Sequence, residues 1–377
     1  MRGIGWWILA LVAAAVLLAA SGYRTRDADS RAYIAIATRL AEEPASTWIA
    51  PQWWGAWGGQ GLFREHPAGT FVPPALLARA GYPAAQSLFV VTLVAQIVAM
   101  LALVALASCL VPSGHARLLL WVLPLIPIAF VFRVRANQEY LLLAGLVVAV
   151  YGVERARTGA AWTVLAVLGA LFALLVKGVF GVLAPVMAAI WLWTRRSRVG
   201  VGAGGWFALA VLAALPLLTA WIYEQAYVAA TGQSFVGYYL GARIGLDSGG
   251  TLPLPLDKAA NAIWYAGRVI WYAAPWSVVA LLALAAFRRE VLPSGTREWL
   301  RFALLASAAT IALVAARDTK ADRYIFPAYF LVASAGVLYA CARWPRVSAV
   351  SERLDRYWPW GPALAWFILV AGRIAFR

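Results

Sequence analysis

Two carboxylates, Asp27 and Asp29, follow the first apolar run of the chain in the stretch RTRDADSRAYIAIATRL. Asp29 and Tyr33 are spaced i, i+4 and share one face of a helix, which apolar residues continue to Leu40. Such a helix is expected to lie along a membrane surface with its apolar face down. A carboxylate held there could contribute to an acid/base centre. The plainer alternative is that Asp27 or Asp29 only caps the helix.

A second group of chemically capable residues lies in FREHPAGTFVPPALL, where Arg64, Glu65 and His66 are consecutive. A cation, an acid and a base side by side could bind a phosphate or a metal ion, or tune a proton transfer. The alternative is a solvated loop that ends in a proline-rich turn.

Two charged residues border apolar runs further along. Glu139, in FRVRANQEYLLL, opens an apolar helix, where a carboxylate suits the positive end of the helix dipole. It is either an ordinary helix-start acid or a second acid that faces Asp29 across a cavity. Lys177, in LLVKGVFGVLAP, separates two apolar runs. An ionisable residue at membrane depth suggests function, and a snorkelling lysine is the alternative.

The stretch DTKADRYIFPAYF supplies Lys320, Arg323 and Tyr324 at one end of a late apolar run. Lys320 and Arg323 could hold a phosphate, because arginine presents a planar fork of donors. An ordinary charged turn is the alternative. Considered together, the acids and cations of these separate segments suit an anionic lipid head group beside an acid/base centre.

The elements that must position these residues are membrane spans. The chain of 377 residues is 63% hydrophobic and 13% charged, whereas soluble domains are about 25% charged. Long apolar runs recur, and a run of about 20 residues crosses a bilayer core of roughly 30 Å. We predict an all-α polytopic membrane protein with about eleven spans, at 4–21, 84–111, 116–132, 138–153, 160–176, 179–194, 204–222, 264–287, 299–316, 324–341 and 359–375. A tight turn or a broken helix is expected at Lys177-Gly178.

Charge predicts the topology. The net charge of +16 comes from basic residues scattered through short loops, which indicates orientation and lipid contact, and we expect no nucleic-acid binding. The positive-inside rule favours a cytoplasmic N-terminus, with the long connections 22–83 and 223–263 both external. Most acidic residues lie on that external side. The two cysteines form no CxxC motif, so a disulfide framework is not expected.

Six stretches, in the family's order, resemble the GT-C glycosyltransferase superfamily, in particular the protein O-mannosyltransferase and lipid A aminoarabinose transferase family. The resemblance covers most of residues 1–341. Its stretches are DSRAYIAIATRL, REHPAGTFVPPALL, RVRANQEYLLLAGLVVAVYG, LLVKGVFGVLAPV, WYAAPWSVVALLAL and DRYIFPAYFLVA.

The resemblance implies a GT-C fold with external juxtamembrane helices in the first long loop. It also implies a polyprenyl-phosphate-sugar donor, an external acceptor and inversion at the anomeric carbon. Asp29 matches the position of the catalytic base, and Glu139 the second acidic position. The substrate-binding residues that it implies are Tyr33, Arg64, Glu65, His66, Lys177, Arg243, Lys320, Arg323 and Tyr324.

The expected cofactor is at most a divalent metal ion, Mg, Mn or Zn, with Asp29, Glu65 and Glu139 as its ligands, and no organic cofactor is expected. The expected partners are the lipid-linked sugar, membrane lipids and a lipid, glycan or protein acceptor. Two features depart from the family. His66 stands where many relatives have lysine, and no large soluble periplasmic domain follows the last span, which favours a lipid, a glycan or a small acceptor.

We expect one integral membrane domain over 1–377, located in a bacterial inner membrane with its active site on the external face. Within it, 1–222 would form the catalytic-type module, 223–263 a second external loop and 264–377 the C-terminal helices. Two rival functions remain open. One is a transporter or flippase of a lipid-linked anionic substrate, although no internal repeat is evident. The other is an envelope assembly or scaffold protein without transferase activity.

Overall fold

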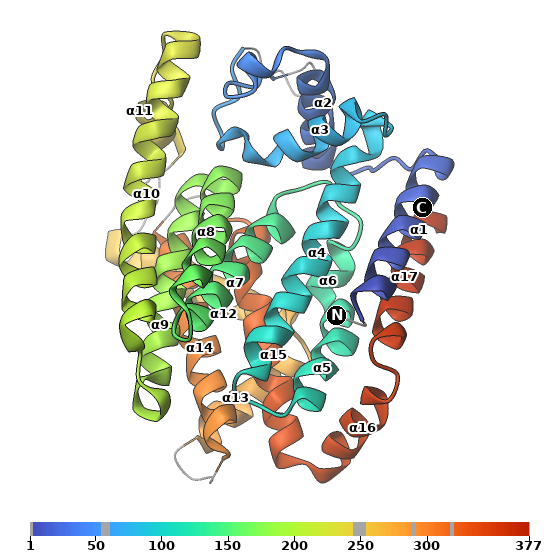
Figure 1. Ribbon diagram of the computed structural model, residues 1–377, viewed down its shortest axis with the longest axis vertical. Helices are drawn as coiled ribbons and strands as arrows, with labels where there is room; N and C mark the ends of the chain where they lie inside the picture. Colours follow the sequence, from blue (N-terminus) through green and yellow to red (C-terminus); the bar gives the residue numbers. More distant parts are fainter. Residues whose placement is uncertain (1–2, 54–60, 244–253, 288–291, 317–319, 377) are drawn as a thin grey trace.

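The computed structural model describes residues 3–53, 61–243, 254–287, 292–316 and 320–376. The described part is built from helices, and the pairing between Gln52 and Leu62 is an isolated bridge. The predicted all-α class is therefore confirmed. Most helices run along the long axis of the molecule, while the short helices α2 (Ala28–Glu42) and α3 (Val72–Arg79) cover one end (Figure 1).

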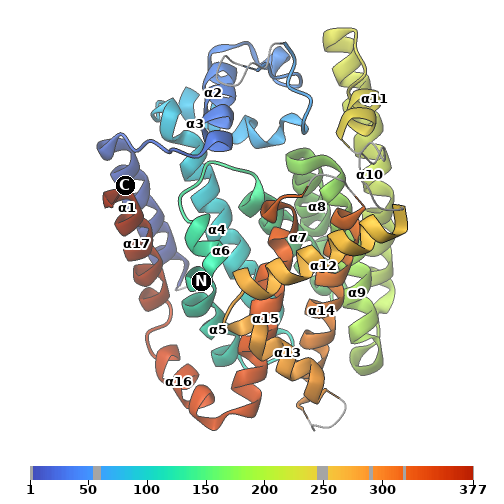
Figure 2. The same cartoon turned by 180° about the vertical axis from the view of Figure 1, so that it is seen from behind.

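The helices α1 (Ile4–Ser21) and α17 (Trp360–Ala375) lie side by side at one edge of the molecule (Figures 1 and 2). Trp7 of α1 packs against Trp366 of α17, with ring centroids 6.3 Å apart. α1 stops at Gly22, whose φ of 54° is left-handed, a conformation that glycine adopts without strain. The end of α17 therefore lies close to the segment that follows α1 (Figure 1).

The surface helix predicted from the spacing of Asp29 and Tyr33 and the apolar residues to Leu40 is present as α2. Its apolar stripe is buried, with Ile36, Ala37 and Leu40 each 1% exposed. Beneath it, the rings of Tyr33, Phe63 and Phe71 meet edge to face, with centroids 5.2 to 6.2 Å apart. Burial of this stripe holds α2 against α3 and α4, as expected of an amphipathic helix.

α7 (Glu139–Ala156) packs against α4 (Ala84–Ser108), α8 (Thr163–Lys177) and α9 (Leu183–Val199). α7 and α8 approach closely because small residues face each other. A Cβ added to Gly152 would lie 2.4 Å from the backbone nitrogen of Ala166. The chain reverses between α8 and α9 through the 3₁₀ turn η5 (Gly178–Val182), where Gly178 has a φ of 57°. The turn predicted at Lys177-Gly178 is thus confirmed.

The predicted span at 116–132 is a broken helix. α5 (Ser113–Val122) leads into a 3₁₀ turn, η3 (Leu123–Leu125), and α6 (Pro127–Val131) follows. Pro124 and Pro127 lie at the first turns of their helices because proline has no N–H to donate in a helix interior. The apolar run predicted one continuous span, whereas two prolines divide the segment into shorter helices.

The predicted connection 223–263 is largely helical where the structure describes it. α10 (Gly202–Thr231) continues beyond its apolar part, and α11 (Phe235–Tyr238), the π-helical turn η6 (Tyr239–Arg243) and α12 (Leu254–Tyr272) follow. The Glu224 carboxylate accepts hydrogen bonds from the backbone N–H groups of Phe235 and Val236, which folds α11 back onto α10. Polar residues ended the apolar run here without ending the helix.

The last third of the chain begins with α12 and α13 (Trp276–Ala286), which are bent by 115° relative to each other (Figure 2). The remaining elements are α14 (Ser294–Ala315), the 3₁₀ turn η7 (Asp322–Ile325), α15 (Phe326–Arg343) and α16 (Pro345–Asp355). α15 is enclosed by α13, α14, α5 and α7, whereas α16 lies at the end of the molecule opposite α2 (Figure 1).

Within the described ranges, six helical segments are long and apolar enough to cross a membrane, or up to seven if the bent pair α12–α13 is one span. One of the six, Ala160–Arg196, contains α8 and most of α9. The number of eleven spans predicted from the sequence is therefore not confirmed, while a polytopic helical membrane fold is.

Candidate active site

The two carboxylates at the start of α2 have different surroundings. Asp27 is the N-cap: its Oδ2 accepts hydrogen bonds from the backbone N–H of Ser30 at 3.0 Å and from the Ser30 hydroxyl at 2.6 Å. Its Oδ1 lies 3.3 Å from Nη1 of Arg135. The capping alternative thus applies to Asp27. Asp29 lies in the first helical turn with a side chain that is 43% exposed.

The partner of Asp29 comes from the far end of the sequence. Nη1 of Arg323 forms an ion pair with Oδ2 of Asp29, and the Arg323 side chain is 35% exposed. Arg323 belongs to η7, which α15 anchors in the protein interior. The preceding residue, Asp322, accepts a hydrogen bond from the Tyr272 hydroxyl and forms an ion pair with Arg268. η7 therefore holds Arg323 against Asp29 of α2.

Glu139 and Lys177 form a buried pair. Nζ of Lys177 donates to Oε1 of Glu139 at 2.9 Å, and the two side chains are only 2% and 3% exposed. Oε2 of Glu139 is buried and has no hydrogen-bond partner in the described part of the chain. Lys177 therefore does not snorkel, and the Glu139 carboxylate meets Lys177 rather than open space across from Asp29.

The aromatic ring of Tyr324 lies between the two ion pairs. The guanidinium carbon of Arg323 is 5.7 Å from its centroid and Nζ of Lys177 is 5.8 Å away. Phe180, from the turn after Lys177, stacks on the same ring at 5.7 Å. Cations over aromatic faces gain electrostatic stabilisation. The half-exposed pair and the buried pair are thus joined through one residue that the sequence had singled out.

The remaining predicted residues have surroundings of their own. Arg64 lies over the ring of Tyr238 at 4.1 Å, and Glu65 and His66 are half-buried beside it in the chain. Lys320 is exposed, two residues before η7. Tyr33 is 8% exposed and packs on Phe71, so its ring belongs to the core beneath α2. The side chain of Arg243 lies outside the described residues.

The predicted set of three metal ligands is not formed. Among the residues that the structure describes, no group of three or more His, Cys, Asp or Glu side chains is placed to hold a metal ion. Glu139 is enclosed with Lys177, while Asp29 belongs to the half-exposed pair with Arg323. Burial on one side and exposure on the other separate the carboxylates that the sequence suggested would converge.

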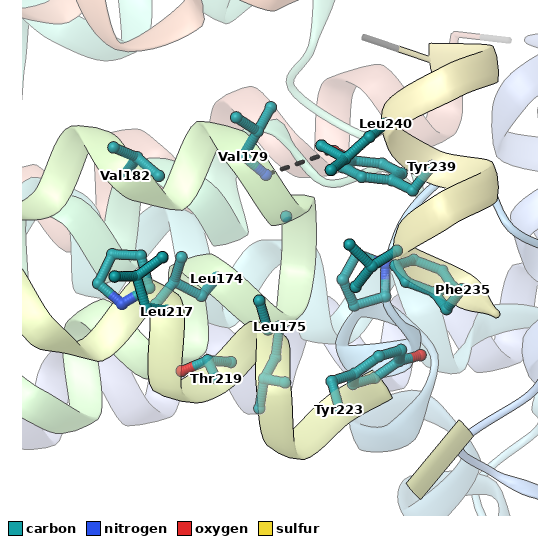
Figure 3. Close-up of a pocket in the computed structure, with 15 residues that line it drawn as sticks. Leu174, Leu175, Val179, Val182, Leu217, Thr219, Tyr223, Phe235, Tyr239 and Leu240 are labelled. Carbon is teal, nitrogen blue, oxygen red and sulfur yellow. Dashed lines mark hydrogen bonds between the residues drawn. The ribbon is translucent and has the colours of Figure 1, made fainter. Parts of the chain in front are cut away.

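An apolar groove of about 330 Å³ opens beside the Lys177–Gly178 turn (Figure 3). Side chains of α8, α10 and α11 line it, including Leu174, Leu217, Thr219 and Phe235. Its far wall contains Leu240 and Tyr239, whose hydroxyl accepts a hydrogen bond from the backbone N–H of Val179 at 3.3 Å (Figure 3).

Gly178 is required where this groove meets the turn. A Cβ there would lie 2.6 Å from the Tyr239 hydroxyl oxygen, and the positive φ already disfavours any other residue. The lining residues were not predicted as a site, because ordinary apolar residues in membrane spans give no signal of their own. Only the Lys-Gly turn pointed to this place.

Several solved structures share this architecture. No protein-family model matches the chain, and a comparison with curated proteins finds no match. The crystal structure of ArnT from Cupriavidus metallidurans bound to undecaprenyl phosphate aligns with a TM-score of 0.65 at 15% identity, over 98% of this chain and 70% of that protein. The Archaeoglobus fulgidus oligosaccharyltransferase in complex with Zn and sulfate aligns with a TM-score of 0.52 at 12% identity, over 97% of this chain and 53% of its own length.

Both solved proteins are GT-C glycosyltransferases. The chain has the GT-C fold. The fold that the sequence resemblance implied is therefore confirmed. The short helices α2 and α3 and the long bundle whose end they cover belong to this architecture. The chain spans about half of the length of the oligosaccharyltransferase.

Proposed function

We propose that the protein is an inverting glycosyltransferase of the external membrane face, which moves a sugar from a polyprenyl-phosphate donor to an acceptor. The acceptor offers a hydroxyl or phosphate oxygen and is a lipid, a glycan or a protein. The observation that carries this proposal is the half-exposed Asp29 carboxylate on the surface helix, held by Arg323 of η7 within a GT-C fold. It is the best-placed base among the carboxylates predicted from the sequence.

In the proposed reaction, Asp29 takes the proton of the acceptor hydroxyl while that oxygen forms a bond to the anomeric carbon. The bond from this carbon to the phosphate oxygen breaks, and its electron pair leaves with the polyprenyl phosphate. Attack from the face opposite the leaving group inverts the anomeric centre. A carboxylate also stabilises the oxocarbenium-like transition state, because positive charge develops on the sugar.

The departing phosphate needs cations rather than a strong acid, because it leaves as a stable anion. Arg323 is our first candidate, since its half-exposed side chain can exchange the carboxylate for a phosphate at small cost. Further candidate cations, taken from the sequence, are Lys320, Arg64 and Arg243. Glu139 and Lys177 are too deeply enclosed to touch substrate as they stand. We assign them the role of holding Tyr324 and the Gly178 turn in position.

The apolar groove is a suitable place for the polyprenyl chain of the donor. It begins at the Gly178 turn, two residues from Phe180, and is lined almost entirely by apolar side chains. ArnT, whose structure shares the fold, was crystallised with undecaprenyl phosphate. An isoprenoid chain buries apolar area at roughly 25 cal/mol per Å², so a groove of this kind contributes much of the donor affinity.

The experiment is to incubate the purified protein with undecaprenyl-phosphate-linked sugars and measure released undecaprenyl phosphate. Ala220→Trp fills the groove, and Ala214→Trp adds the same bulk to another face of α10 as the control. We expect the groove variant to raise KM for the long-chain donor at least about tenfold, and to affect a short-chain donor little. Movement of lipid-linked sugar across vesicles without release of lipid phosphate would overturn the proposal.

A further inference from the structure

A second cavity, of about 540 Å³, lies between the segment after α1, the segment before α7 and the end of α17. Four arginines line it: Arg24, Arg26, Arg135 and Arg373. They come from three separate parts of the chain, which the pairing of α1 with α17 brings together (Figures 1 and 2). The residues of the apolar groove and the pair Asp29–Arg323 do not line this cavity.

The cavity holds more positive than negative charge. Asp27 is its one acidic lining residue, and that carboxylate is already engaged by Ser30 and by Arg135. In the described part of the chain, no carboxylate lies within ion-pair distance of Arg24, Arg26 or Arg373. Like charges gathered around one hollow repel each other unless an anion enters it. Guanidinium forks match phosphate oxygens in particular.

The position of the cavity points to a membrane lipid as the source of that phosphate. α1 is apolar enough to span a membrane, and the cavity lies at its end. Large apolar side chains of the two neighbouring helices are exposed below it: Val12 (51%) and Val16 (61%) on α1, and Leu364 (48%) and Ile368 (58%) on α17. A lipid with its phosphate in the cavity can lay its chains along these faces. Basic pockets between membrane helices on the cytoplasmic side of other proteins bind anionic head groups through the same attraction of charges.

We propose that this cavity binds the phosphate of an anionic membrane lipid through Arg24, Arg26, Arg135 and Arg373. Arg135 contacts Asp27, the N-cap of α2, so the bound lipid also stabilises the beginning of the helix that carries Asp29. The proposal needs no glycosyl donor and does not depend on the proposed transfer reaction.

The test is native mass spectrometry of the full-length protein with phosphatidylglycerol and, separately, phosphatidylcholine of the same chain length. We expect the wild type to bind phosphatidylglycerol at least about tenfold more tightly, since each basic residue at a surface strengthens the attraction roughly fivefold. R24Q/R26Q/R373Q should weaken this binding on the order of 10- to 100-fold. Equal affinity for the two lipids in the wild type would overturn the proposal.

The matched control removes three exposed arginines from α16 and its C-cap, at the other end of the molecule, as R346Q/R353Q/R356Q. This control should keep the preference for phosphatidylglycerol. An equal loss of affinity in both glutamine variants would mean that overall charge, and not this cavity, determines binding, and would overturn the proposal. R24K/R26K/R373K keeps the charge but loses the guanidinium forks, so we expect an intermediate affinity. This variant carries the test if R24Q/R26Q/R373Q folds poorly. Displacement of the lipid by an equal concentration of inorganic phosphate would overturn its assignment to a lipid.

Discussion

Two groups of charged residues, one toward each end of the molecule, differ in how deeply their side chains are buried. At the end covered by α2, Asp29 and Arg323 form a single ion pair with side chains that are 43% and 35% exposed. Toward the other end, Arg195 joins Glu154 at 2.9 Å and Glu298 at 3.0 Å, with side chains only 6% to 8% exposed. Arg157 and the indole N–H of Trp191 also donate to Glu154. The Asp29–Arg323 pair is thus half-exposed, whereas the network of Glu154, Arg195 and Glu298 is enclosed.

This difference in burial suits the buried network to stabilising the fold and the half-exposed pair to contacting substrate. The Glu154–Arg195–Glu298 network links α7, α9 and α14, and its hydrogen bonds compensate the charges that burial would otherwise disfavour. It has little capacity left for a ligand. An exposed pair contributes about 0–1 kcal/mol, so a substrate can displace one partner at small cost. Glu139 and Lys177 are an intermediate case, because they lie near the α2 end but are enclosed like the network.

Asp29→Asn provides the strongest test of the comparison. We expect glycosyl transfer to fall on the order of 10³-fold, because the proton acceptor is lost, while thermal unfolding stays close to that of the wild type. Release of undecaprenyl phosphate and the unfolding midpoint measure the two effects. Asp27→Asn is the matched control and should retain most activity. Full activity in Asp29→Asn would remove Asp29 from the role of base.

Arg195→Met tests the enclosed end. It leaves two buried carboxylates without their shared cation, so we expect a loss of about 3–5 kcal/mol in the free energy of unfolding. Activity per folded molecule should not change, because Glu154 lies roughly 22 Å along α7 from Glu139, at the far end of the helix from the proposed site. The comparison would break if Asp29→Asn destabilised the protein as much as this variant does.

The intermediate pair can be sharpened with a double variant. Lys177→Met alone leaves the Glu139 charge buried and should destabilise the protein by about 3 kcal/mol. E139Q/K177M removes both charges and should recover most of that loss. If the pair only positions Tyr324, the double variant keeps kcat within about tenfold of the wild type. A stable double variant that has lost all transfer would instead make Lys177 a direct ligand of the phosphate.

Asp27→Ala should have the smallest effect. It removes the N-cap of α2, which typically costs about 1 kcal/mol. The half-exposed position of Arg135 limits what its ion pair adds. A chemical-denaturation curve in detergent measures the change. A loss as large as that of Arg195→Met would mean that the α2 end is not loosely held.

Local patterns predicted the local structure well. The i, i+4 spacing of Asp29 and Tyr33, with apolar residues to Leu40, indicated a surface helix, and α2 covers Ala28–Glu42. The Lys-Gly dipeptide indicated the turn between α8 and α9, where the left-handed φ of Gly178 permits the reversal. These features depend on neighbours in sequence, which a single chain displays directly.

Pairings between distant residues were not predictable. Asp29 and Arg323 are far apart along the chain, and Glu139 pairs with a lysine 38 residues later. Such contacts depend on the depth and rotation of each helix, which are set by packing that apolar composition does not reveal. The same reason explains why two acids expected to converge on one metal site lie apart, and why the apolar groove gave no sequence signal.

The enclosure of α15 also has a consequence for how the chain is made. Nearly all of its residues are buried by other helices, so in the finished protein this apolar segment meets protein instead of lipid. Apart from α16, which follows directly, the helices that contact it most are α5, α7, α13 and α14, and all four precede it in sequence. Because a chain emerges from the ribosome N-terminus first, the surrounding helices are present when α15 enters the bilayer. The order of synthesis thus agrees with the order in which the bundle can close.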